Sequence, residues 1–357
     1  MLGQFFFING GYWSKIEYLW HRNRTPMSHK RFFILLWFMI FTFSGLLAQE
    51  SSSVFNFLSL SSSAHTTALG GQNISTVEDD ASMIFTNPVA LSNTSSHTLN
   101  LNYMNYMRGT HTGSAAYVQA QGTRGSWGVG TQFVSYGSVK ETNEWGEVMG
   151  TMSPLDLNIT GGYSYALSDR WVGGVMGKFL YSKYGSFSSV GLCVDLAANY
   201  YDEERDFSIS AAVTNLGAQV KAFGETHERL PINLKLGFSK GLGRLPARIT
   251  VTMFDINHWA HDYYFNSTGE EVGGFTIFMN HFALGLDVFP TKYIWLALGY
   301  NFRRAYEMKA GGSSHAAGLS LGAGVDIKRF KVGLAWSKQH VSTNSICVSL
   351  SYNFNKQ

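Results

Sequence analysis

The clearest pattern in the chain is a strict two-residue alternation over residues 344–354, close to its carboxyl end. The apolar positions are Ile346, Val348, Leu350, Tyr352 and Phe354, and between them lie Ser345, Cys347, Ser349, Ser351 and Asn353. Successive side chains of a β-strand point to opposite faces. The segment is therefore predicted to be an amphipathic strand with one apolar face and one face of small or polar residues.

The same alternation recurs between residues 97 and 354 and predicts fourteen strands. The expected ranges are 97–107, 112–121, 125–136, 155–166, 171–182, 187–200, 206–215, 231–241, 246–256, 279–289, 292–302, 314–325, 328–338 and 344–354. Each is about as long as the ~9–11 residues that a tilted strand needs to cross a bilayer, or slightly longer. Residues 51–96, in contrast, lack sustained alternation and are rich in Ser, Thr and Asn.

The lengths of the connections support a membrane barrel. The connections after even-numbered strands are short, whereas four of those after odd-numbered strands are long: 137–154, 216–230, 257–278 and 303–313. Short periplasmic turns that alternate with longer external loops are typical of transmembrane barrels. We therefore expect an all-β fold, a 14-stranded antiparallel transmembrane β-barrel in the bacterial outer membrane, with both termini periplasmic. A soluble β-solenoid or propeller is the alternative, but no fixed repeat is present.

Composition agrees with this fold class. Charged residues are 14% and aromatic residues 15% of the chain, and mean hydropathy is −0.05, too polar for a bundle of membrane helices. A net charge of +3 does not indicate a nucleic-acid partner. Cys193 and Cys347 lie on the polar faces of strands far apart in order, so we expect two free thiols rather than a disulfide.

The only long apolar run covers residues 32–48 and follows the basic segment 28–31. A basic start, an apolar core and small residues near Ala48 are typical of a secretory signal peptide. The run is also near the lower limit for a membrane helix, but its place before a β-rich body favours export. We expect 27–48 to be the signal peptide, 1–26 an upstream extension before Met27, and the exported chain to begin near Gln49.

Three short segments carry a family resemblance. They are Ala-Leu-Gly-Gly-Gln-Asn-Ile at 68–74, Glu-Asp-Asp-Ala-Ser at 78–82 and Asn-Pro-Val-Ala-Leu at 87–91. In order and spacing they resemble the amino-terminal signature of the FadL-like (FadL/TodX) outer-membrane family, with Val89 where Ala is usual. The resemblance implies that 49–96 forms a hatch inside the lumen and that 97–357 forms the barrel. The signature residues are Gly70, Gly71, Asp79, Asp80, Asn87 and Pro88.

Within that family the chain is most similar to the PorQ branch, at 101–106, 136–146 and 215–217. This resemblance implies a non-catalytic component of the type IX secretion attachment complex of Bacteroidetes. Such a component anchors a PorZ-like surface protein, with PorU and PorV in the same complex, and secreted cargo is attached to lipopolysaccharide. The alternative is a FadL-like channel for long-chain fatty acids or other hydrophobic compounds. The mainly small, polar inward face argues against that alternative.

The sequence does not indicate an enzyme. It has neither a nucleophile elbow nor a phosphate-binding glycine loop, and we expect no cofactor. Asp79 and Asp80 are predicted to satisfy backbone donors of the hatch. The loop 257–278 holds possible metal ligands, His258, His261 and Asp262, but its aromatic residues favour contact with a partner protein. The predicted docking residues are Trp259, Tyr263, Tyr264 and Phe265, and no metal site is expected.

Glycines give a second indication of a filled lumen. Most of them fall on the face opposite the apolar one, at Gly128, Gly130, Gly191, Gly237, Gly285, Gly299, Gly322 and Gly324. Residues without side chains on that face leave room for a plug, so a wide open pore is not expected.

Overall fold

The computed structural model describes residues 53–107, 109–260, 272–308, 316–340 and 343–355. The predicted upstream extension and signal peptide lie outside these residues. No helix in the described ranges is long and apolar enough to cross a membrane.

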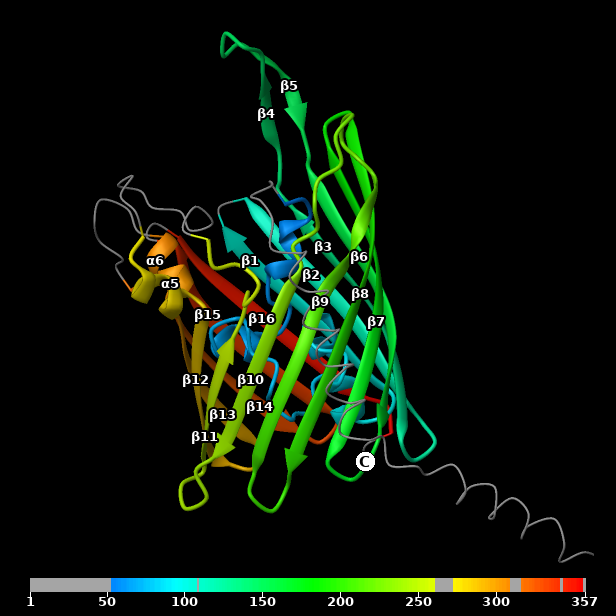
Figure 1. The fold of residues 1–357 in the computed structure, drawn as a ribbon, viewed down its shortest axis with the longest axis vertical. Helices are drawn as coiled ribbons and strands as arrows, with labels where there is room; N and C mark the ends of the chain where they lie inside the picture. Colours follow the sequence, from blue (N-terminus) through cyan, green and yellow to red (C-terminus); the bar gives the residue numbers. More distant parts are fainter. Residues whose placement is uncertain (1–52, 108, 261–271, 309–315, 341–342, 356–357) are drawn as a thin grey trace, which may run out of the picture. The chain divides into compact units, whose positions relative to one another are not determined.

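Fourteen strands form one closed antiparallel barrel, as the alternation predicted (Figure 1). They are β1 (Thr98–Met107), β2 (Thr110–Gln121), β3 (Gly125–Ser135), β6 (Leu155–Ala166), β7 (Trp171–Tyr184), β8 (Phe187–Asp202), β9 (Phe207–Lys221), β10 (Asn233–Gly241), β11 (Ala247–Met253), β12 (Phe282–Thr291), β13 (Ile294–Asn301), β14 (Leu319–Ile327), β15 (Phe330–His340) and β16 (Thr343–Asn353). Each strand pairs with its neighbours in sequence order, apart from the inserted β4 and β5, and β1 closes the barrel on β16 from Thr98↔Asn353 to Asn105↔Ile346.

The barrel has two distinct ends. One, which we call the short-turn end, carries the tight connections such as 122–124, 203–206 and 328–329. The other, the long-loop end, carries the extended connections. There, the predicted loop 137–154 is a hairpin of β4 (Val139–Thr142) and β5 (Val148–Met152), which rises beyond the barrel (Figure 1). The connections after β11 and β13 include the short helices α5 (Gly274–Asn280) and α6 (Phe302–Glu307).

The alternation along β16 has the predicted orientation. Ile346, Val348 and Leu350 are 50%, 41% and 41% exposed on the outside, whereas Cys347 and Ser349 are buried toward the lumen. Cys193 and Cys347 are both free, as predicted, and both are buried. The other strands repeat this division, which gives the barrel an apolar outer band and a lumen face of small and polar residues.

Replacing Leu350 with arginine tests the outward orientation. A charged side chain near the middle of the lipid face should lower the free energy of unfolding by about 2–4 kcal/mol. Leu350→Ala is the matched control, because it shortens the side chain without adding a charge. Equilibrium unfolding in lipid, followed by heat-modifiable mobility, measures both variants. Equal stability of the two would place residue 350 away from lipid.

Residues 53–96 lie inside the lumen and form the hatch. It contains the short helices η2 (Asn56–Ser59), α3 (Ala64–Ala68), η3 (Ala81–Phe85) and α4 (Ala90–Asn93). Helix α3 packs against β13 to β16, and η3 and α4 pack against the wall from β1 to β6. The glycines of the wall face the hatch. A Cβ at Gly130 would lie 2.8 Å from the side chain of Phe85, and a Cβ at Gly237 would lie 2.7 Å from that of Ile74. The prediction of a filled lumen is therefore confirmed.

The described chain begins at the long-loop end. Ser53 bridges Arg229, in the connection after β9. Asn353, the last residue of β16, donates its backbone N–H to the carbonyl of Arg329 in a short turn. From Ser53 the hatch passes along the lumen and reaches β1 at the short-turn end. The amino terminus itself lies outside the described residues, so a periplasmic location of both termini remains a prediction.

Candidate functional site

Asp79 and Asp80 hold the hatch together and attach it to the wall. The carboxylate of Asp79 accepts hydrogen bonds from the backbone N–H and hydroxyl of Ser95, both at 2.7 Å, and pairs with Lys331 of β15 at 2.8 Å. Asp80 accepts the backbone N–H of Ser82 at 2.9 Å and so caps η3. Both carboxylates thus satisfy backbone donors, as the sequence predicted, and Asp79 also contributes an ion pair to the barrel.

Gly70 and Gly71 let the hatch backbone turn against the wall. Their φ angles are 90° and 82°, in the left-handed region that favours glycine. The backbone N–H of Gly70 contacts Ser320 of β14, and a Cβ at Gly299 of β13 would lie only 2.3 Å from the Gly70 nitrogen. The turn therefore needs glycine on both the hatch and the wall.

Asn87 and Pro88 fix the next part of the hatch. The Asn87 amide donates to the carbonyl of Ile74 at 2.7 Å, and its carbonyl accepts the backbone N–H of Val89 at 3.0 Å. Pro88 lies against the wall at Gly174, where a Cβ would approach it to 2.8 Å. The signature residues thus serve the packing of the hatch.

The predicted docking loop is described only in part. Trp259 is 43% exposed, packs on His281 with ring centroids 4.1 Å apart, and donates its indole N–H to the carbonyl of Ile256. His258 pairs with Asp255 at 2.7 Å. Trp259 therefore rests on the barrel rim. The remaining residues of interest lie outside the described part of the chain: His261, Asp262, Tyr263, Tyr264 and Phe265.

A buried charge cluster joins the hatch to strands β11 and β12, and none of its members was among the site residues predicted from the sequence. His65 Nδ1 lies 2.5 Å from Glu78 Oε2, and His65 Nε2 lies 2.7 Å from Asp287 Oδ1 of β12. Arg248 of β11 contacts both Glu78 and Asp287, the latter at 2.7 Å. The cluster thus pairs two hatch residues with two wall residues. We call these four residues the charge latch.

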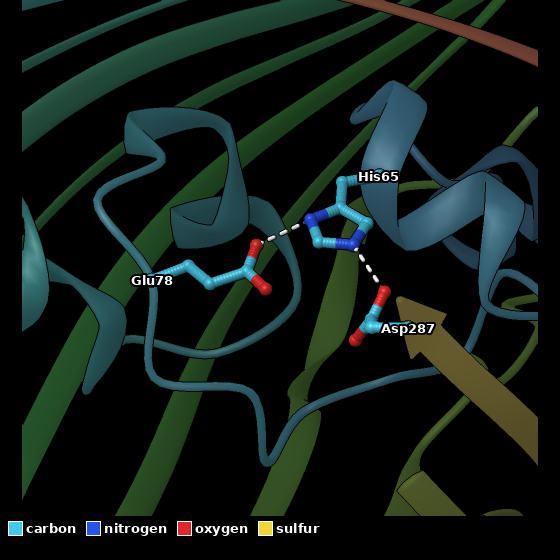
Figure 2. A group of neighbouring side chains, drawn as sticks. All are labelled: His65, Glu78 and Asp287. Atoms are coloured by element: carbon cyan, nitrogen blue, oxygen red, sulfur yellow. Dashed lines mark hydrogen bonds and ion pairs between the residues drawn. The ribbon is translucent and has the colours of Figure 1, made fainter. Parts of the chain in front are cut away.

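A His, a Glu and an Asp in contact could in principle hold a metal ion. Figure 2 shows, however, that the His65 ring lies between the two carboxylates and directs one nitrogen to each. Both nitrogens therefore carry protons, whereas a metal ligand needs a free nitrogen lone pair. Arg248 adds a positive charge to both carboxylates. The arrangement fits a network of ion pairs better than a metal site.

The two hatch members of the latch have strongly shifted pKa values. Burial alone would lower the pKa of His65, but the charges of Glu78 and Asp287 outweigh burial and raise it to about 10. Burial alone would raise the pKa of Glu78, but His65 and Arg248 lower it to about 2. The imidazolium also stacks on Trp295, with centroids 4.0 Å apart and planes 17° from parallel. Both residues are therefore charged at neutral pH.

These shifts predict how hatch closure depends on pH. The contribution of His65 should be complete below pH 6.5 and fall progressively as pH rises to about 10, because its pKa is raised on docking. The contribution of Glu78 should be complete above pH 4.5 and fall as pH drops to about 2. Ion leakage through planar bilayers should therefore be lowest between pH 4.5 and pH 6.5 and increase as the pH rises above this range. His65→Gln should remove the alkaline increase; an unchanged increase would exclude His65 as its cause.

A cavity of about 280 Å³ lies beside the latch, between the hatch and the wall at the short-turn end. Its lining combines charged groups with aromatic rings: His65, Glu78, Arg248, Phe289, Trp295 and Lys331. Such a lining offers an apolar surface and polar partners to the same molecule. The cavity is therefore suited to a small amphipathic compound.

Comparison with known proteins identifies the fold of the chain. No family model and no curated protein matches the chain. Among solved structures, the Pseudomonas putida toluene transporter TodX matches with a TM-score of 0.52 at 13% identity, over 84% of this chain and 99% of that one. The Ralstonia pickettii toluene transporter TbuX matches with 0.55 at 14%, over 85% and 100%. The chain therefore has the fold of the FadL/TodX-like 14-stranded outer-membrane β-barrels.

Proposed function

We propose that this protein is a hatch-gated outer-membrane channel for small hydrophobic or amphipathic compounds, long-chain fatty acids among the candidates. The observation that carries the proposal is the lumen itself, which the hatch fills and to whose wall it is joined by noncovalent hydrogen bonds and ion pairs. The TodX-like fold supports it, because two structures that share the fold, TodX and TbuX, are toluene transporters. The cavity beside the charge latch supplies a place for such a compound within the closed barrel.

Uptake by cells that lack their own channel tests this function. Cells that express the chain should take up a labelled fatty acid or toluene faster than cells with an empty vector. A variant with a weakened latch, Arg248→Met, should increase the rate further if the hatch limits passage. Failure of both proteins to exceed the empty vector would contradict a channel for these compounds.

A second candidate function is the scaffold role in a type IX attachment complex, and the β4–β5 hairpin favours it. Trp145 at its tip is 82% exposed. The tip is ordered: the side-chain carbonyl of Asn143 accepts the backbone N–H groups of Trp145 and Glu147 at 3.0 and 2.9 Å. An ordered, exposed tryptophan is a common anchor of protein interfaces. In this role the hairpin binds a PorZ-like surface protein that acts with PorU and PorV.

Deleting parts of the long-loop end separates the two functions. Removal of 139–152 should release the surface protein and its cargo while the barrel remains heat-modifiable and solute uptake is unchanged. Removal of 259–272 tests the loop predicted from the sequence in the same assay. Normal retention of the surface protein in both deletion strains would contradict a scaffold role for these loops.

A further inference from the structure

A second cavity, of about 200 Å³, opens at the long-loop end of the lumen, away from the charge latch. Its walls come from the start of the hatch, from β6 and β7, and from the connections after β3 and β9. The residues that shape it are Phe57, Tyr136, Asp156, Tyr184, Phe223 and Glu228. A water molecule occupies about 30 Å³ in the liquid, so the cavity can hold a group several times larger.

Asp156 places a negative charge at the wall of this cavity. Its side chain points into the lumen and the residue is only 2% exposed. Its carboxylate accepts hydrogen bonds from the hydroxyls of Tyr136, at 2.6 Å, and Tyr184, at 3.1 Å. The hydroxyl of Tyr136 stays neutral, because burial and the contact with Asp156 raise its pKa. Neither hydrogen bond supplies a positively charged partner to the carboxylate.

The described residues that line the cavity include no lysine, arginine or histidine. Glu228 adds a second carboxylate to the lining. A buried carboxylate without a cationic partner is costly. The cavity thus has the electrostatic character of a cation site.

Aromatic rings form the rest of the wall. The rings of Tyr136 and Tyr184 have centroids 5.9 Å apart at 41°, and those of Tyr184 and Phe223 are 5.3 Å apart at 76°. Rings at such different angles present several faces and edges to one space. Aromatic faces attract organic cations, and aromatic cages beside a carboxylate suit ammonium groups. Hard metal ions instead need several oxygen ligands or retained water.

We propose that this cavity binds an organic cation, an alkylammonium or quaternary ammonium group, with its charge directed at Asp156 and its carbon atoms against Tyr136, Tyr184 and Phe223. We call it the ammonium cage. The site lies at the end that the connection lengths assign to the cell exterior. It goes beyond the proposed channel, since binding here requires neither passage nor movement of the hatch.

Calorimetric titration of the full chain in detergent tests the cage, with choline chloride as the probe. Choline should bind. Its uncharged carbon analogue, with a tert-butyl group in place of the trimethylammonium group, should bind at least about tenfold more weakly, because only the charge differs. Equal affinity for the two, or no binding of choline, would overturn the proposal.

Two variants locate the site. Asp156→Asn keeps the size of the side chain and should weaken choline binding by about tenfold or more. Glu225→Gln is the matched control, since Glu225 is exposed in the connection after β9 and does not line the cavity. Phe223→Leu leaves the carboxylate intact and should weaken binding several-fold, which keeps the test decisive if Asp156→Asn fails to fold. Unchanged affinity in a folded Asp156→Asn or in Phe223→Leu would overturn the assignment.

Discussion

Replacing Arg248 with methionine should release the hatch and make the outer membrane leaky. The substitution keeps an unbranched side chain like the methylene stem of arginine but removes the cation that Glu78 and Asp287 share. Two carboxylates would then remain buried with only His65 between them, and breaking a buried ion pair from one side costs about 3–5 kcal/mol. The expected result is higher bilayer conductance and greater sensitivity of cells to large antibiotics, with the barrel still folded.

Two further variants separate this effect from a general loss of charge. Arg244→Met removes an exposed arginine from the β10–β11 turn at the same end and should leave conductance unchanged. Adding Asp287→Asn to Arg248→Met should bring the conductance part of the way back to that of the unmodified protein, because it removes one of the two carboxylates that lost their cation. Conductance of Arg248→Met equal to that of the unmodified protein would mean that the charge latch does not hold the hatch.

Gly299→Ala should displace the hatch through steric overlap alone. A Cβ at this position would lie 2.3 Å from the nitrogen of Gly70 and 2.4 Å from the carbonyl oxygen of Ala68. Both are backbone atoms and cannot rotate away, so the cost should reach or exceed the ~1–3 kcal/mol of ordinary overpacking. The hatch should become sensitive to added protease while the barrel keeps its heat-modifiable mobility.

Gly161→Ala is the matched control for this substitution. Its Cβ would lie on the outer face, 3.7 Å from Val129, at an ordinary contact distance. It should leave the hatch protected. If Gly299→Ala also left the hatch protected, the close approach of the Gly70 turn to β13 would be wrong.

The barrel could be predicted because its physical cause is local. Lipid on one side and a small-residue lumen on the other impose a two-residue period on every strand, so the fourteen strands could be located without knowing their neighbours. The hairpin β4–β5 was missed because its strands lie beyond the barrel and all of β4 is exposed. The Asn-Glu-Trp-Gly turn at 143–146, where Gly146 has a φ of 79°, was the available signal.

The charge latch and the ammonium cage could not be predicted in this way. The latch is complete only where the hatch brings His65 and Glu78 to the wall, and the cage depends on two connections of the long-loop end that have no periodic pattern. A partial signal existed for the wall side of the latch. Arg248 and Asp287 are opposite charges on the inward faces of strands predicted to be adjacent, and they form a directly opposed pair. The positions of His65 and Glu78 depend on the path of the hatch, which has no periodic pattern.

Movement of the hatch is the central claim, and a reversible cross-link tests it most directly. A Cβ at Gly333 of β15 would lie 3.3 Å from the Cβ of Ala64 in α3, close to the ~3.5–4.5 Å of disulfides. Ala64→Cys with Gly333→Cys, in a background of Cys193→Ser and Cys347→Ser, should form a disulfide between hatch and wall. Uptake of labelled fatty acid or toluene should stop when the protein is oxidised and return on reduction. Full uptake by completely cross-linked protein would contradict a channel that opens by moving its hatch.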